Sequence, residues 1–215
     1  MDAIALRNDV LEELEFEPSV NAGNIGVAVS HGVVTLTGHV GSLAEKAAVE
    51  RAVGRIRGVR GIAQEIQVRL PANRKTNDDE IAERALKIIA WDTTIPADRV
   101  QVTVENGWVK LRGTVDWDFQ RQAAANAVHQ LSGVMGLTND LTVGQSASAT
   151  DVKLRIDKAL KRAAELDAAN IRVGVVGGRV TLDGTVQSLH ERRAAQRAAW
   201  SAPGVHVVED RIKVA

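Results

Sequence analysis

The histidines and acidic residues are the side chains of this sequence that could bind a metal or transfer protons. The histidines follow no spacing that would place two of them on one metal ion. The run Asp78-Asp79-Glu80 stands at the start of a predicted helix, where negative charge offsets the helix dipole. No cysteine is present. The sequence therefore predicts no metal, no cofactor and no enzymatic activity. The histidines are His31, His39, His129, His190 and His206.

A glycine-rich segment, Gly174-Val175-Val176-Gly177-Gly178, has the composition of a phosphate-binding loop. Phosphate-binding loops connect a strand to the start of a helix, where backbone amides converge on the anion. This segment instead lies on a predicted strand and the hairpin turn that follows it. We therefore expect it to be structural.

One basic position recurs along the chain, as Lys46, Arg121 and Arg192. Each of these residues belongs to a predicted helix, and successive members lie 75 and 71 residues apart. A structural or solvated role and a contact with phosphate both explain a recurring base. No Asp, Glu, His or Ser recurs in the same way.

Aromatic residues gather in the second third of the chain. Trp117 stands at the start of a predicted helix, where Ser42 and Ser188 occupy the equivalent positions. Loss of such a capping serine costs about 1 kcal/mol, unless Asp116 or Asp118 replaces it. A residue that breaks a local rule is a candidate for function. Our hypothesis is a contact patch for lipid or a partner domain; packing between domains explains the same residues. The patch consists of Trp117, Phe119 and Arg121.

Basic residues gather in the last third. Residues 151–215 carry 12 Lys and Arg against 8 Asp and Glu, although the whole chain has 27 of each sign. Each base near an anionic membrane contributes roughly 1 kcal/mol. A solvated face, or docking onto acidic neighbours, explains the same charges. The candidates are Lys153, Lys158, Lys161 and Arg162 on one predicted helix, and Arg192, Arg193 and Arg197 on another.

The elements that carry these residues follow from an internal repeat. Superposing Gly32, Gly107 and Gly178 aligns three segments without a gap. Polar stretches separate them and are typical of linkers. We predict domains at 1–69, 78–144 and 151–215, joined by linkers at 70–77 and 145–150.

Each domain is predicted to have the order αββαβ. Apolar residues four apart, such as Leu6, Val10 and Leu14, indicate a helix. Strict alternation in the following segments indicates a hairpin of two strands. A second helix follows, with Ser42-x-x-Glu45 and Ser188-x-x-Glu191 as capping boxes. Its predicted inner face has small residues at matched positions, and a third strand ends the domain. Those small residues are Ala48, Ala123, Ala194, Ala52, Ala127 and Ala198.

Glycine occupies three structural positions in every domain. The first lies in the hairpin turn, which needs positive φ. The second interrupts the second strand, as at a bulge or a close backbone approach. The third ends the second helix. We expect an α+β fold in which two helices cover one face of a three-stranded mixed sheet. The structural glycines are Gly32, Gly38, Gly58, Gly107, Gly113, Gly133, Gly178, Gly184 and Gly204.

This pattern resembles the BON domain, a bacterial module of osmotically inducible and nodulation proteins. The resemblance is carried by the hairpin glycine, the segments Val34–Val40, Val109–Val115 and Val180–Val186, the alanine-bearing helix and a Gly-Val pair before the last strand. It covers nearly the whole chain three times. The resemblance implies association with phospholipid or membrane surfaces and a role in envelope stress, without catalytic activity.

Our leading expectation is thus a stress-related, soluble binding protein that associates with an anionic phospholipid surface. The alternative is a cytosolic scaffold or chaperone-like module that binds protein and no lipid. Nucleic acid is a poor fit, because the chain has no net charge. The sequence as given shows no signal peptide or membrane span, so we expect a cytoplasmic location, or a periplasmic one if a signal has been removed.

Overall fold

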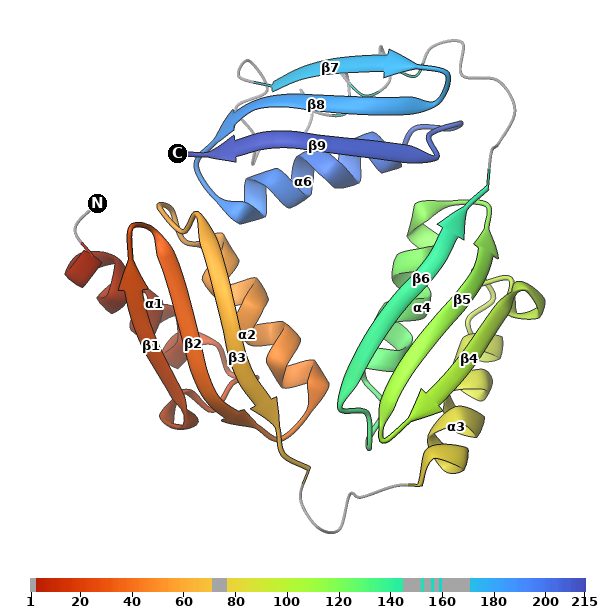
Figure 1. The fold of residues 1–215 in the computed structure, drawn as a ribbon, viewed down its shortest axis with the longest axis horizontal. Coiled ribbons are helices and arrows are strands. Elements are labelled where there is room, and N and C mark those ends of the chain that lie inside the picture. The colour runs from red at the N-terminus through yellow and green to blue at the C-terminus, as the bar shows by residue number, and fades with distance from the viewer. Residues whose placement is uncertain (1–2, 71–76, 145–151, 153–155, 157–158, 160–170) are drawn as a thin grey trace. The chain divides into compact units, whose positions relative to one another are not determined.

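The computed structural model describes residues 3–70, 77–144, 152, 156, 159 and 171–215. Within them the chain forms successive copies of one unit, which we call repeats 1, 2 and 3 (Figure 1). Repeat 1 consists of α1 (Ala3–Phe16), β1 (Ile25–Ser30), β2 (Val33–Val40), α2 (Leu43–Arg55) and β3 (Gly61–Val68). Repeat 2 consists of α3 (Asp78–Trp91), β4 (Val100–Glu105), β5 (Trp108–Val115), α4 (Asp118–His129) and β6 (Gly136–Val143). Repeat 3 has β7 (Ile171–Val176), β8 (Arg179–Val186), α6 (Leu189–Trp200) and β9 (Val207–Val214).

Each repeat contains a separate three-stranded sheet with its second strand at the centre. The first two strands form an antiparallel hairpin, and in repeats 2 and 3 the last strand pairs with the central one in parallel. In repeat 1 the amides of Arg60 and Arg69 donate to Gly32 and Val40, the same pattern as at the two ends of the other parallel pairs. The expected α+β fold with mixed sheets is confirmed.

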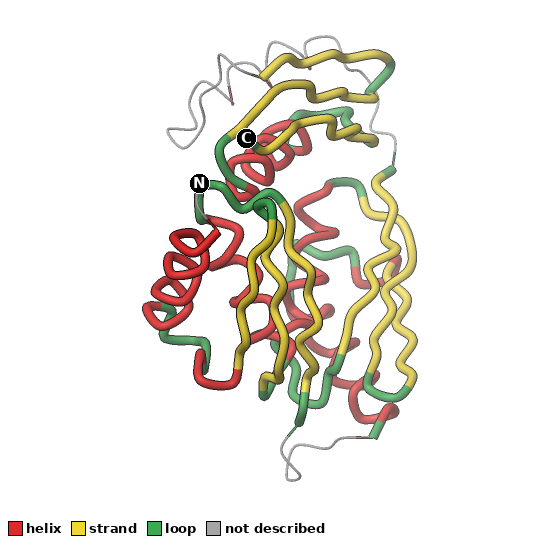
Figure 2. The backbone as a smooth tube through the Cα atoms, turned by 60° about the vertical axis from the view of Figure 1, so that its left-hand side comes forward, coloured by secondary structure: helices red, strands yellow, loops and turns green. Residues whose placement is uncertain are grey.

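Helices cover one face of each sheet, as Figure 2 shows for repeats 1 and 2. The predicted stripe of α1 is buried, with Leu6, Val10 and Leu14 at most 2% exposed. In repeat 3, Val152 and Ile156 are helical and belong to the same buried cluster as the sheet. Alternate strand residues point into these cores, as expected for half-buried strands.

The inner face of the second helix differs from the prediction in repeats 2 and 3. Ala48 and Ala52 in α2 and Ala194 in α6 are buried as predicted, but Ala123, Ala127 and Ala198 are only half-buried. In each second helix the residues that directly follow these alanines are buried in all three repeats. The apolar face of a helix is wide enough to include two neighbouring positions in each turn. Those following residues are Val49, Ala124 and Ala195, and Val53, Val128 and Ala199.

The nine recurring glycines all have positive φ. The requirement for glycine is strictest at the position in the central strand. A Cβ atom on Gly113 would lie 1.9 Å from the carbonyl oxygen of Arg99, and one on Gly38 would lie 2.1 Å from that of Asn24. No side chain fits at such a distance, so this glycine lets the hairpin backbones approach closely.

The hairpin turn of repeat 2 is held by the first helix. Both carboxylate oxygens of Asp78, the first residue of α3, accept hydrogen bonds from backbone amides of the turn: Asn106 at 2.7 Å and Gly107 at 2.8 Å. The acidic run 78–80 therefore begins a helix, as predicted, and also fixes the turn. The same contacts place the start of α3 beside the β4–β5 turn, and the end of α3 toward the opposite end of the repeat.

Candidate functional site

The start of the second helix is built alike in repeats 1 and 3. The Ser42 hydroxyl accepts the amide of Glu45 at 3.1 Å, and the Ser188 hydroxyl accepts the amide of Glu191 at 3.1 Å. Each glutamate in turn accepts the amide of the residue before the serine, at 2.9 and 3.0 Å. These are the capping boxes expected from the sequence, and they satisfy backbone donors that the helix leaves open.

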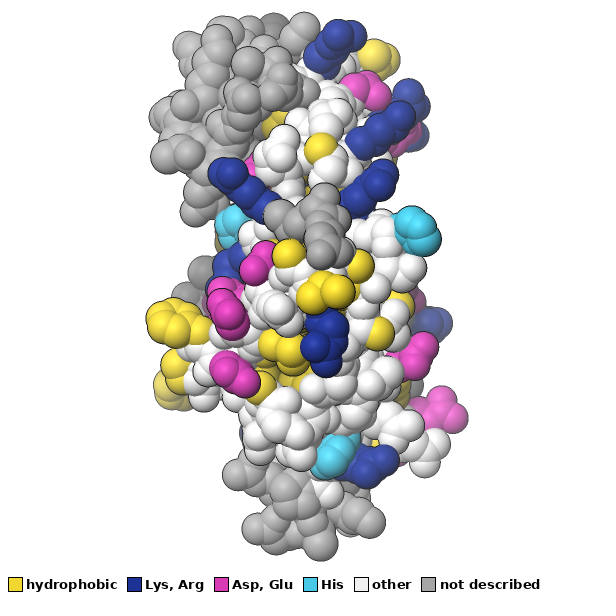
Figure 3. Space-filling model, turned by 90° about the vertical axis from the view of Figure 1, so that its left-hand side faces the viewer, with side chains coloured by type: hydrophobic (Ala, Val, Ile, Leu, Met, Phe, Trp, Pro, Cys, Tyr) yellow, Lys and Arg dark blue, Asp and Glu magenta, His cyan; other side chains and the backbone are white. Residues whose placement is uncertain are grey.

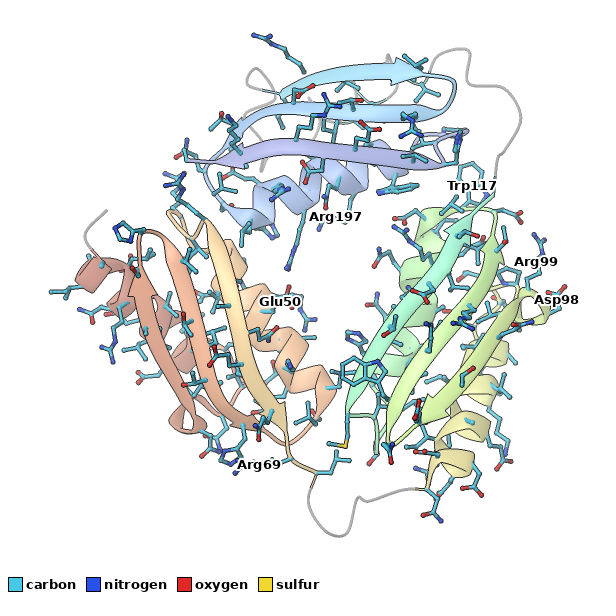
Figure 4. All side chains as sticks on the ribbon, viewed as in Figure 1. Glu50, Arg69, Asp98, Arg99, Trp117 and Arg197 are labelled. Carbon is cyan, nitrogen blue, oxygen red and sulfur yellow. The ribbon has the colours of Figure 1, made fainter. Side chains whose placement is uncertain are left out.

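Repeat 2 departs from this arrangement. Trp117 is the residue before α4, and its side chain makes no capping hydrogen bond. Gln120 restores part of the cap, because its Oε1 accepts the amides of Asp116 at 3.0 Å and Trp117 at 3.1 Å. Neither aspartate replaces the serine: Asp116 pairs with Arg99 at 2.9 Å, and the carboxylate of Asp118 pairs with Arg121. Figure 4 shows Trp117 and Arg99 at this end of the repeat.

Asp118 is the residue that most distinguishes this helix start. It is 6% exposed and occupies the position that Leu43 and Leu189 hold in the other repeats. Its Oδ1 lies 2.5 Å from Nη2 of Arg121. Burial raises the pKa of the Asp118 carboxyl, and the Arg121 guanidinium opposes that rise. Sequence analysis considered Asp118 only as a replacement for the capping serine and missed its burial; the available signal was an acid at a position where the other repeats have leucine.

Repeat 2 has a further exposed aromatic residue, at the end of α3, that sequence analysis did not select. Phe119 is 56% exposed and Trp117 is half-buried. The side-chain amide of Gln120 donates to the Thr94 carbonyl at 3.0 Å, which ties the start of α4 to the loop after α3. Trp91, the last residue of α3, is 87% exposed. We call Trp91, Trp117 and Phe119 the aromatic end of repeat 2.

The charges near the aromatic end are mainly negative. Asp98 and Asp116 lie beside a single base, Arg99, which pairs with Asp116. Asp92 accepts both the amide and the hydroxyl of Thr94, which holds the pKa of that carboxyl below its ordinary value. Arg121 is held by Asp118. This end therefore presents exposed aromatic rings in an acidic setting.

The recurring basic residue of the second helix forms an ion pair within its own repeat in repeats 2 and 3. Arg121 pairs with Asp118, and Nε of Arg192 lies 2.5 Å from Asp210, whose side chain is 8% exposed. Gln196 donates to the same oxygen of Asp210 at 2.7 Å. Lys46 is half-buried on α2. Arg121 pairs with a buried acid of its own helix and Arg192 with one on β9, so the structural interpretation accounts for both arginines.

The basic candidates of repeat 3 are only partly visible. Lys153, Lys158, Lys161 and Arg162 lie outside the described residues. Arg193 is half-buried on α6. Arg197 is exposed, has no side-chain partner among residues that the structure describes, and projects from α6 on the side away from the sheet (Figure 4).

In the described part of the chain, no group of three His, Asp or Glu side chains could hold a metal ion. Gly174 lies in β7 and Gly177 in the β7–β8 turn, as expected for a hairpin. Every helix among the described residues is too short or too polar to cross a bilayer.

Comparisons with known proteins identify the unit. The family model of the BON domain matches residues 4–69, 77–145 and 148–215. Osmotically-inducible protein Y of Escherichia coli K12 is 27% identical over 146 residues, which are 66% of this chain and 72% of that protein. Among solved structures, the C-terminal domain of CdsD, a structural protein of the type III secretion system of Chlamydia trachomatis, is 14% identical with a TM-score of 0.28 over 100% of both chains. The periplasmic domain of PrgH is 10% identical with a TM-score of 0.22, over 89% of this chain and 95% of that one.

The three matches coincide with the repeats that the structure contains and together cover nearly the whole chain. The chain belongs to the BON domain family and contains three tandem copies of the domain.

Proposed function

We propose that this chain is a non-enzymatic, stress-related protein whose BON domains associate with anionic phospholipid surfaces. The stress-related role is supported by its similarity to an osmotically inducible protein. A non-enzymatic role is supported by the positions common to all repeats, which are glycines, alanines and aliphatic residues that turn or pack the chain.

The observation that carries the lipid proposal is an excess of base in repeat 3 with an exposed arginine. Residues 151–215 hold 12 Lys and Arg against 8 Asp and Glu. Arg192 is neutralised by Asp210, but Arg197 stands exposed on α6. Figure 3 shows both signs of charge interspersed on one face of the molecule, so attraction to an anionic surface has to come from local groups such as this one.

Vesicle co-sedimentation tests the proposal. The full chain should sediment with vesicles of phosphatidylglycerol and phosphatidylcholine, and much less with phosphatidylcholine alone or at high salt. Arg197→Gln should weaken sedimentation by roughly fivefold, the value of one base at an anionic surface. Arg51→Gln is the matched control, because Arg51 is exposed at the equivalent position of α2. Equal sedimentation with charged and neutral vesicles would reject the proposal.

The aromatic end of repeat 2 favours a second candidate, a protein-interaction module. Trp91 and Phe119 are exposed, and the nearby acids Asp98 and Asp116 repel an anionic membrane. Aromatic rings are enriched at the cores of protein interfaces. Trp117→Ser separates the candidates: if it leaves vesicle sedimentation unchanged, this end has no role in lipid contact.

A further inference from the structure

One end of repeat 1 combines two loops that are distant in sequence. The β1–β2 turn contains His31 and Gly32, and the loop between α2 and β3 contains Arg57 and Arg60. The amide of Arg60 donates to the Gly32 carbonyl at 2.8 Å. The Arg60 side chain lies over Gly32, since a Cβ atom there would be 2.8 Å from Cδ of Arg60. We call residues 30–33 and 56–61 the hairpin end of repeat 1.

The hairpin end of repeat 1 is cationic. Arg57 and Arg60 are exposed, and neither has a side-chain partner in the described chain. Neither loop contains an Asp or Glu. The neighbouring Arg55 differs, because it pairs with Glu13 at 2.6 Å and with Glu17 at 3.4 Å. Two arginines with their charge uncompensated therefore stand at the same end of the sheet, beside His31.

Exposed apolar residues accompany these charges. Val33 is 41% exposed, and one of its methyl groups lies 3.7 Å from where a Cβ atom of Gly61 would be. Ile4, near the start of α1, is 69% exposed. Figures 1 and 2 both show the start of α1 beside the β1–β2 turn. Cationic side chains beside small exposed apolar ones suit the membrane interface, where the cations contact phosphate headgroups and the apolar side chains contact the acyl chains.

The same end of the other repeats is apolar but lacks this charge. In repeat 2, Trp108 and Met135 are exposed, while the turn is flanked by Glu105 and bound by Asp78. Met135 occupies the position of Arg60, and a serine occupies that of Arg57. In repeat 3, Val176 is exposed and Arg179 is paired with Glu209.

We infer that the hairpin end of repeat 1 is a docking surface for an anionic phospholipid membrane. Arg57 and Arg60 bind headgroup phosphates, and Val33 enters the interfacial layer. The charge complementarity selects an anionic surface, and the exposed apolar residues select a membrane over a free phosphate ion. This inference rests on the proposed function, since it names a second lipid contact, in repeat 1, beside that of Arg197 in repeat 3.

The test uses the full chain and vesicles of phosphatidylglycerol and phosphatidylcholine. The double variant Arg57→Gln/Arg60→Gln should bind roughly 30-fold more weakly, since each base contributes about fivefold. The matched control is Arg51→Gln/Arg69→Gln, which removes two exposed bases from other parts of the same repeat; Figure 4 shows Arg69 at its opposite end. Thermal unfolding of both variants should match the unaltered chain.

The outcomes separate this inference from the proposed function. If the unaltered chain binds anionic vesicles and both double variants lose affinity equally, overall charge decides binding and the docking surface is wrong, although the proposed function stands. If the unaltered chain binds no vesicle, both ideas fail. If the unaltered chain does not bind vesicles but binds polyglutamate, and Arg57→Gln/Arg60→Gln loses that binding, the ligand of this surface is an acidic protein segment. The lipid assignment is then overturned.

Discussion

Replacing Asp118 by leucine should stabilise repeat 2. This residue is 6% exposed, and its equivalents are Leu43 and Leu189. Leu43 is 8% exposed, so the same site in repeat 1 accepts a buried leucine. Arg121, the ion-pair partner, has 26% of its side chain exposed and can turn to solvent after the change.

The expected gain is about 1–2 kcal/mol at neutral pH. Replacing a buried ion pair with apolar side chains of similar volume is neutral or stabilising by about 1–4 kcal/mol. Only one partner is replaced here and Arg121 is left unpaired, so the lower part of that range applies, with 26% of the Arg121 side chain already exposed to water. Asp118→Asn is the matched control: it removes the charge and keeps the shape, without the apolar gain.

The gain should depend on pH. Burial raises the pKa of the Asp118 carboxyl in the folded protein above its ordinary value. The folded chain therefore holds this proton more tightly than the unfolded chain, and the stability of repeat 2 falls as pH rises through the interval between the two pKa values. Above that interval the difference between Asp118→Leu and the unaltered chain should be largest, and below it the difference should shrink.

Urea denaturation followed by tryptophan fluorescence measures this difference. Trp91, Trp108 and Trp117 lie in repeat 2, and Trp200 in repeat 3 contributes the one remaining indole. The signal therefore reports mainly on repeat 2. Destabilisation of Asp118→Leu by more than about 1 kcal/mol at pH 7 would show that the ion pair is a net stabiliser, the opposite of the expected result.

Two further substitutions test the construction of the repeats. Ser188→Ala should destabilise repeat 3 by about 1 kcal/mol in urea denaturation, because the Glu191 amide loses its acceptor; an unchanged midpoint would mean that the capping box contributes nothing. Gly113→Ala should destabilise repeat 2 by about 3 kcal/mol or more, because the new Cβ meets the Arg99 carbonyl at 1.9 Å and φ is +131°. A loss below about 1 kcal/mol would contradict the close approach of the hairpin backbones.

The repeat, the sheets and the helix caps were predictable from sequence because they depend on local spacing. Alternation of apolar residues identified the strands, and Ser188 and Glu191 are close enough in sequence to reveal a capping box. The ion pair of Arg192 with Asp210 was not predictable in this way. It joins α6 to β9, and no sequence pattern at either residue indicates which residue it pairs with.

The candidate site was only partly predictable. Trp117 and Phe119 were selected because they break the pattern of the other repeats. Trp91 was missed, because no sequence pattern marks an aromatic residue that ends a helix as exposed, and the tie between the loop after it and α4 is a long-range hydrogen bond from Gln120 to Thr94. The burial of Asp118, which sequence analysis considered only as a cap, was missed because it cannot be inferred from a single charged residue at a helix start, where exposed acids are common.

Sedimentation of the unaltered full chain with anionic and neutral vesicles decides whether the BON domains associate with anionic phospholipid. The chain should pellet with vesicles containing phosphatidylglycerol, be released by salt, and stay in the supernatant with phosphatidylcholine alone. Retention in the supernatant with both vesicle types at low salt would show that the chain does not bind an anionic phospholipid surface.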